Sequence, residues 1–348
     1  MENTNKPRRA RQRVTLKEVA KVANVSPITV SNVINGRFHS MSAMTRKRVE
    51  AAIARLNYRV NVAARGLRHS HHYCIALIVV DERPAFLSHP AHNQVAAGLS
   101  NYLNANGYAL AIEGISPDRA EDISYLERLS SDALCLVASG SKPERHAMLE
   151  RLEAAGQPLV VFHEPPTNPG ARTCHIRSDD RAGGRLVATH MLAQGARRFL
   201  LLLPRRDWAS MAERTSGMKA ALRTVKGTTI QTLRIDGLSV VEVGNALEEY
   251  MVRNDLPDAI LAGNDLLAAA ALKFFKLAGC EIPGRMRVCG FGAYDLVQYL
   301  DPTITSIRVP YYTMGQAAGR GILEALSLGH FAQSDLLLPV ELVRGESS

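Results

Sequence analysis

The chain has 348 residues, of which 46% are hydrophobic and 22% are charged, so it can form two or three globular domains with buried cores. Its net charge of +9 is uneven, because residues 1–72 hold 15 Lys or Arg against 3 Asp or Glu, whereas the remainder holds 27 against 30. A basic head favours a polyanionic partner, and the absence of a long apolar run or a basic amphipathic helix argues against a membrane.

Five cysteines are scattered along the chain without a CxxC pair, and most of them stand inside apolar runs: Cys74, Cys135, Cys174, Cys280 and Cys289. Such cysteines are typical of reduced, buried side chains in a cytoplasmic protein. The spacing predicts no structural zinc and no other metal site. Nothing in the chain indicates a cofactor.

The first structured segment is predicted over Thr15–Asn35, after a polar and basic arm at residues 1–13. We expect the arm to be disordered and to add non-specific attraction to phosphates. Thr15 and Glu18 have the spacing of a capping box, and apolar residues then recur at helical spacing. Asn24 tolerates a left-handed backbone, so it predicts a tight turn after this first helix.

A second short helix is predicted after Ser26, with Pro27 at its first position, where no backbone N–H is needed. Its outward face holds small side chains that form hydrogen bonds: Thr29, Ser31, Asn32 and Asn35. Such a face suits the major groove of DNA. A plain helical hairpin with solvated polar residues has the same spacing, so the spacing alone leaves both interpretations open.

A third helix is predicted over Ala43–Leu56, capped by Ser42, and it completes a three-helix domain at residues 14–60. The pattern over Val62–Arg68 is also helical. Seven residues are too few for a stable helix in water. By itself this segment is therefore predicted to be a flexible linker unless something packs on it.

From residue 74 onward, apolar runs of strand length alternate with helical segments. The candidate strands are 74–80, 108–114, 133–139, 158–164, 173–177, 198–204, 230–235, 259–263, 287–291, 305–309 and 336–342. Short apolar strands that alternate with helices are typical of parallel sheets covered on both faces. Because these strands are too many for one open sheet, we predict an α/β domain of two doubly wound lobes. A small-molecule site is expected in the cleft between the lobes, at the carboxyl ends of the strands.

Nearly the whole chain resembles the LacI-type (lactose-repressor) family of bacterial transcription regulators. The most specific stretches are VTLKEVAKVANVSPITVSNVINGR and TRKRVEAAIARLNYRVNVAARGLR, and weaker ones include SDDRAGGRLVATHMLAQGARRFLLL and PDAILAGNDLLAAAALKFFKLAG. The resemblance implies a helix-turn-helix DNA-binding domain at 14–60 and a hinge helix with its linker at 61–72. It further implies a two-lobed, periplasmic-binding-protein-like effector and dimerisation domain at 73–345.

The function implied by this resemblance is that of an allosteric repressor. A homodimer would bind a pseudo-palindromic operator, and a small metabolite, a sugar or sugar derivative, would control its affinity for DNA. The protein would be cytoplasmic and associated with the bacterial nucleoid. A two-lobed sugar receptor without DNA function is the alternative, but it would need an export signal and no basic head. An enzyme is disfavoured, and no catalytic residue is assigned, because the chain lacks the GxxxxGK[ST], GxSxG and HExxH motifs.

The resemblance also implies which residues contact DNA. Base readout is expected from Pro27, Ile28 and Asn32, and Leu67 of the hinge helix would enter a minor-groove base step. Asn32 could pair with adenine, and because many relatives carry Arg there, the operator should differ from theirs. Contacts with the DNA backbone are expected from Thr15, Leu16, Ser26, Thr29, Ser31 and Asn35.

For the effector, the resemblance implies contacts from six residues: Arg214, Asn264, Tyr311, His163, Phe86 and Trp208. Each has a purely structural alternative. Asn264 could only cap a helix, Arg214 could pair with a nearby carboxylate, and Trp208 could simply pack in the core. Gly292 stands where relatives often carry a ligand-binding Asp, and Asp295 could compensate for that loss.

Overall fold

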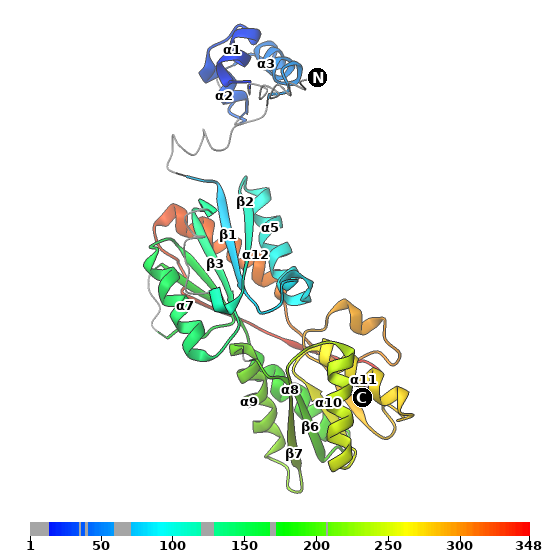
Figure 1. The fold of residues 1–348 in the computed structure, drawn as a ribbon. Helices are drawn as coiled ribbons and strands as arrows, with labels where there is room; N and C mark the ends of the chain where they lie inside the picture. The colour runs from blue at the N-terminus through cyan, green and yellow to red at the C-terminus, as the bar shows by residue number, and fades with distance from the viewer. Residues whose placement is uncertain are drawn as a thin grey trace, which may run out of the picture. The chain divides into compact units, whose positions relative to one another are not determined.

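The computed structural model describes residues 14–34, 36–38, 41–58, 71–119, 129–167, 172–206 and 208–348. The chain divides into two units, Met1–His72 and Tyr73–Ser348, which are described separately (Figure 1). Within the described ranges, no helix is both long enough and apolar enough to cross a membrane.

The first unit contains α1 (Leu16–Ala23), α2 (Pro27–Ile34) and α3 (Ala43–Arg55). The predicted capping box is confirmed, because Glu18 N donates to Thr15 Oγ1 at 3.3 Å and Thr15 N donates to Glu18 Oε2 at 2.6 Å. Asn24 has a φ of 51°, which is the left-handed turn expected from its side chain. The predicted hinge helix falls in residues 59–70, which lie outside the described residues.

A parallel sheet of order β11-β5-β4-β3-β1-β2 forms the first lobe of the second unit. Its strands are β1 (Cys74–Val80), β2 (Ala109–Ile115), β3 (Ala133–Ala138), β4 (Leu159–Phe162), β5 (Thr173–Ser178) and β11 (Asp335–Leu338). Its helices are α5 (Pro90–Ala105), α7 (Lys142–Ala154) and α12 (Tyr311–Leu328), with the short 3-10 helices η1 (Phe86–Ser88) and η2 (Pro117–Arg119). Ile75 and Leu77 of β1 share a core cluster with α5 and α12, whereas Ala76 and Ile78 share another with α7. Alternate residues of one apolar strand thus face helices on both sides of the sheet.

The second lobe repeats this arrangement around the parallel sheet β7-β6-β8-β9. Its strands are β6 (Arg198–Pro204), β7 (Thr229–Ile235), β8 (Ala259–Ala262) and β9 (Arg287–Cys289). Its helices are α8 (Asp180–Ala193), α9 (Ala209–Leu222), α10 (Val240–Arg253) and α11 (Asp265–Leu277), with the 3-10 helix η3 (Asp295–Gln298). Leu201 of β6 packs in the cluster of α8 and α9, and Leu202 packs in that of α10 and α11. The prediction of two doubly wound parallel lobes is confirmed (Figure 1).

One predicted strand, residues 336–342, is wrong as a single element. The chain forms β11 in the first lobe and then β12 (Glu341–Val343), which pairs antiparallel with β10 (Ser306–Arg308). Pro339 separates the two strands and has no N–H to donate to a sheet. The last apolar run therefore connects the two lobes instead of ending one sheet.

Candidate functional site

Helix α2 presents the residues that were predicted to read DNA bases. Ile28 is 72% exposed, Pro27 is exposed and Asn32 is partly exposed. The opposite face holds Val30 and Val33, which are buried against α1 and α3. An isoleucine side chain with this much exposed surface buries little apolar area in the fold, so that surface remains available for contact with a partner.

The side chains predicted to contact the DNA backbone also form the helix caps of this unit. Thr29 N donates to Ser26 Oγ at 3.2 Å, and the two hydroxyl oxygens lie 2.9 Å apart. Thr15 belongs to the capping box, and Leu16 packs against the core, so Leu16 can offer a phosphate only its backbone N–H at the start of α1. Ser31 is partly exposed on α2. Two predicted contacts lie outside the described residues: Asn35 and Leu67.

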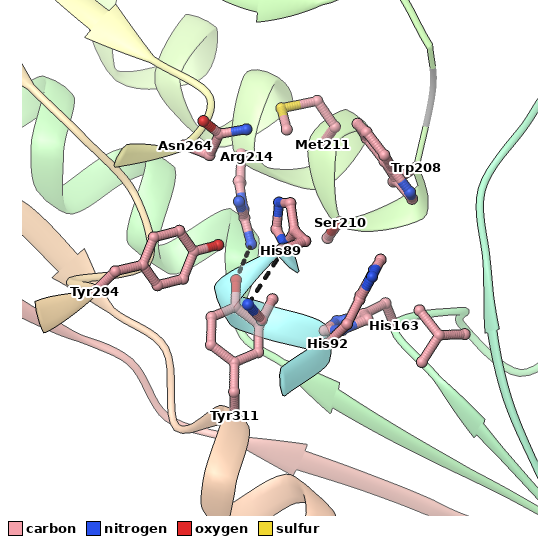
Figure 2. Close-up of a pocket in the computed structure, with 12 residues that line it drawn as sticks. His89, His92, His163, Trp208, Ser210, Met211, Arg214, Asn264, Tyr294 and Tyr311 are labelled. Carbon is pink, nitrogen blue, oxygen red and sulfur yellow. Dashed lines mark hydrogen bonds between the residues drawn. The ribbon is translucent and has the colours of Figure 1, made fainter. Parts of the chain in front are cut away.

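The second unit contains a partly open pocket, here called the cavity, at the carboxyl ends of strands from both lobes (Figure 2). Five of the six residues predicted to contact the effector line it: His163, Trp208, Arg214, Asn264 and Tyr311. The structure thus brings together residues that are far apart in the sequence. They come from β4, α9, α11 and α12 or from the loops beside these elements.

Phe86 is the predicted residue that does not line this cavity. Its ring packs where a side chain at Gly114 would otherwise lie. Its carbonyl oxygen is 3.0 Å from His92 Nδ1, and because a carbonyl can only accept, His92 donates this bond. Phe86 therefore positions a lining residue.

Arg214 lines the cavity and is only 3% exposed. Its Nε donates to Asp180 Oδ1 at 2.7 Å, its Nη1 to Gly263 O at 2.9 Å and its Nη2 to the Tyr311 hydroxyl at 3.1 Å. The guanidinium also lies 4.0 Å from the centre of the Phe291 ring, a cation–π contact. Arg214 thus pairs with a carboxylate, which was the structural alternative, and it also lines the cavity.

Burial opposes the charge of Arg214, yet the neighbouring Tyr311 and Asp180 hold its pKa above the ordinary value. Asp180 lies at the start of α8 and also accepts a hydrogen bond from Ser178 Oγ at 2.8 Å. The pair therefore has a charge-assisted geometry inside a buried wall.

Asn264 also has two roles. Its side-chain oxygen accepts from Leu267 N at 2.9 Å and so caps α11, and the residue lines the cavity while only 3% exposed. Because the oxygen is committed to the cap, the amide N–H groups are what Asn264 can offer a ligand.

The sequence-based prediction missed four polar residues of the lining: His89, His92, Ser210 and Tyr294. His89 caps α5 by accepting from Ala91 N at 3.3 Å, and its ring lies 4.9 Å from that of His92. Tyr294 stacks 6.0 Å from Tyr311. The signal available for the histidines was the segment LSHPAHN, a helix start shortly after a strand.

The three histidines of the cavity are held neutral. Burial lowers the pKa of His163 to about 3, with Arg214 and His92 acting in the same direction. Burial likewise lowers the pKa of His89 and of His92. The buried carboxyl of Asp265, beside the cavity, has a pKa raised to about 6 by burial.

Gly292 leaves no room for the Asp that the family resemblance leads one to expect at this position. It has a φ of +130°, and a Cβ placed there would lie 2.7 Å from the Tyr294 ring. Asp295 is exposed at the start of η3 and is not part of the lining, so it does not replace that carboxylate.

The described residues contain no group of three His, Cys, Asp or Glu side chains that could hold a metal ion. All five cysteines are free thiols.

Residues 15–61 match the family model "Bacterial regulatory proteins, lacI family", and residues 188–348 match a "Periplasmic binding protein-like domain". The chain belongs to the LacI family. The "HTH-type transcriptional repressor PurR" of Aliivibrio salmonicida is 27% identical and covers 96% of this chain and 98% of its own length. The "HTH-type transcriptional regulator CelR" of Thermobifida fusca is 28% identical, covering 97% and 99%.

Solved structures have the same fold over the whole LacI-family chain. A lac repressor "bound to ONPG in repressed state" has a TM-score of 0.80 at 24% identity and covers 97% of this chain and all of its own. A "transcriptional regulator CelR-cellobiose complex" has a TM-score of 0.69 at 25% identity with the same coverage. The LacI-family protein is therefore a DNA-binding transcription regulator and not an enzyme or a free-standing receptor.

Proposed function

We propose that this LacI-family protein is a repressor that binds a pseudo-palindromic operator as a homodimer and is controlled by a small metabolite in the cavity of its second unit. Support for repression comes from relatives that are named repressors, among them PurR and the ribose operon repressor of Bacillus subtilis. The CelR–cellobiose complex supports a sugar or sugar derivative as the metabolite. Because its target is the genome, we place the protein in the cytoplasm.

The observation that carries this proposal is the position of Arg214 between the two lobes. It is bonded to Asp180 and Gly263 in the second lobe and to Tyr311, the first residue of α12, in the first. A ligand that binds Arg214 and Tyr311 together favours one arrangement of the lobes. Where the operator also binds one lobe arrangement more tightly, the ligand changes operator affinity by the same coupling free energy by which operator binding changes ligand affinity.

A second contact between the lobes borders the same cleft. Arg206, which follows β6, donates through Nε to Ser139 Oγ at 3.0 Å and through Nη1 to the carboxylate of Glu82. Ser139 and Glu82 follow strands β3 and β1 of the first lobe. These bonds and the Arg214–Tyr311 bond are among the contacts that opening of the lobes would break.

For DNA, we propose that Pro27, Ile28 and Asn32 read base edges, and that Leu67 enters the minor groove. The caps at Thr15, Ser26 and Thr29 would place the domain on phosphates together with Leu16, Ser31 and Asn35. The support is the exposure of Ile28 and Pro27 above a fixed valine core.

The experiment is a binding selection with genomic fragments, followed by titration of the selected site in a salt series. We expect steep salt dependence and loss of about 1–3 kcal/mol of operator affinity in Asn32→Ala, with non-specific affinity unchanged. A thermal-shift screen of sugars, sugar acids and polyols then identifies metabolites, each tested for its effect on operator affinity. No selected sequence, or no metabolite that changes operator affinity, would contradict the proposal.

A further inference from the structure

The cavity of the second unit is rich in hydrogen-bond donors and poor in acids. Its described lining includes three histidines, an arginine, an asparagine and a serine, but no Asp or Glu. Carboxylates are the strongest acceptors that a protein can offer to the hydroxyl groups of a neutral polyol. Because this lining lacks them, a ligand in the cavity faces the charged guanidinium of Arg214 but no carboxylate.

The carboxyl of Asp81, which lies 3.9 Å from His92 Nδ1, accepts from Arg83 N at 2.9 Å, and two further carboxyl groups beside the cavity are also bonded within the protein. Asp180 accepts from Arg214 and from Ser178. Asp265 accepts from Ser306 Oγ at 2.5 Å and from Tyr294 N at 2.7 Å. Neither carboxyl group belongs to the cavity lining, so neither faces the ligand.

Four helices of 13 to 18 residues begin at the cavity. Residues of the lining form the start or the N-cap of each helix: His89 for α5, Trp208 for α9, Asn264 for α11 and Tyr311 for α12. The first turn of a helix has unpaired N–H groups and the positive end of the helix dipole. Their convergence gives the cavity a positive potential without adding a titratable group.

His163 supplies an independent observation. Its Nδ1 is buried and has no hydrogen-bond partner among the described residues. The residue has a φ of 68°, and its ring lies 6.0 Å from that of Tyr311, whose hydroxyl binds Arg214 (Figure 2). A buried ring nitrogen without a partner is unfavourable unless a ligand binds it.

Arg214 also has donors to spare. Its bonds to Asp180, Gly263 and Tyr311 use three of the five N–H groups of a guanidinium. Arg214 and Asn264 line the cavity from the second lobe, and His163 lines it from the end of β4 in the first lobe.

We propose that the effector carries an anionic group, a carboxylate or a phosphate, which is bound by His163 and Arg214 with the help of Asn264. This inference rests on the proposed function, because it assigns a chemical class to the ligand of that same cavity. The rest of the ligand contacts Trp208 and Met211, which provide an apolar surface.

The test is isothermal titration of the full-length protein with matched ligand sets and with inorganic phosphate. The sets are glucose, gluconate and glucose 6-phosphate, and ribose, ribonate and ribose 5-phosphate. We expect inorganic phosphate to bind saturably, and an acid or phosphate form to bind at least about tenfold more tightly than its neutral parent. Tighter binding of the acid identifies a carboxylate ligand, and tighter binding of the phosphorylated form identifies a phosphate ligand.

The matched variants are His163→Asn and His330→Asn. Asparagine tolerates the left-handed backbone at residue 163 but is too short to replace the ring, whereas His330 is exposed and is not part of the cavity lining. We expect the first to weaken phosphate binding at least about tenfold and the second to leave it unchanged. Three results would overturn the inference: neither phosphate binding nor a preference for the acid or phosphorylated forms, equal anion affinity in the wild type and His163→Asn, or tighter binding of the neutral sugars. An anion that binds the cavity without changing operator affinity would instead contradict the proposed regulation and leave this inference intact.

Discussion

The two candidate sites of this LacI-family protein are built in opposite ways. On α2, Pro27 and Ile28 of the proposed DNA readers are exposed, and a separate valine core beneath them supports the helix. In the cavity, most polar residues are buried and several are bonded within the protein, as Arg214 is to Tyr311 and to Asp180 behind it. On α2, the residues proposed to contact DNA are therefore separate from those that stabilise the helix. In the cavity, the same hydrogen bonds serve both ligand binding and stability.

The largest expected effect tests whether the buried bonds of the cavity stabilise the second unit. In Arg214→Met, the carboxyl of Asp180 remains buried without its cation, and we expect the free energy of unfolding of the second unit to fall by about 3–5 kcal/mol. Urea unfolding followed through the single tryptophan, Trp208, measures it. Adding Asp180→Asn should recover part of the loss. If Arg214→Met is as stable as the wild type, the bonds of Arg214 do not stabilise the second unit, and the contrast between the two sites is wrong.

The next effect concerns pH. Because the pKa of His163 is about 3 in the folded protein and about 6.5 when unfolded, the unfolded chain binds more protons between these values. The contribution of neutral His163 to the free energy of unfolding is therefore complete above about pH 6.5 and decreases as the pH falls below that value. From this residue we expect a loss of about 2 kcal/mol between pH 7 and pH 5. Asp265 acts in the opposite direction, since its folded pKa of about 6 lies above the unfolded value.

His163→Asn should therefore flatten the acid-induced loss of stability by that amount, as measured by urea unfolding at the two pH values. Asp265→Asn is the matched control, and it should steepen the same loss. Equal pH dependence in the wild type and His163→Asn would show that this histidine is not buried in its neutral form.

The third prediction sharpens the picture of the DNA-binding unit. Leu67→Ala should keep the three-helix unit folded and weaken operator affinity at least tenfold at fixed salt, about 1.4 kcal/mol, because a minor-groove wedge is lost. Fluorescence anisotropy with the operator and with a scrambled duplex measures both affinities. The scrambled duplex should bind equally well to both proteins, and an unchanged operator affinity would remove Leu67 from the readout.

Sequence reasoning predicted best what local spacing determines. The capping box at Thr15, the left-handed turn at Asn24 and the apolar strands depend on neighbours a few residues apart, so they could be predicted without the fold. The strand broken at Pro339 was missed because an apolar run does not indicate which sheet each half joins.

The cavity was predictable only in part, for the same physical reason. Asp180 and Arg214 are 34 residues apart, and only the packing of α8 against α9 brings them together. His89 and His92 come from the first lobe, whereas Asp180 and Arg214 come from the second. Neither local spacing nor hydropathy relates these two histidines to His163. The family resemblance supplied Arg214, Asn264 and His163, but it did not supply His89 and His92.

The smallest expected effect tests whether recognition and stability are fully separate on the DNA-binding unit. Thr15 is both a predicted phosphate contact and the cap of α1, so Thr15→Ala should cost about 1 kcal/mol of local stability in addition to any DNA affinity. Hydrogen exchange of the α1 amides in the operator-free full-length protein measures that share. Thr15→Ser keeps the capping hydroxyl and should exchange like the wild type. If Thr15→Ala exchanges no faster either, the cap adds nothing to α1, and Thr15 would be a recognition residue alone, as fully separated from the fold as Ile28.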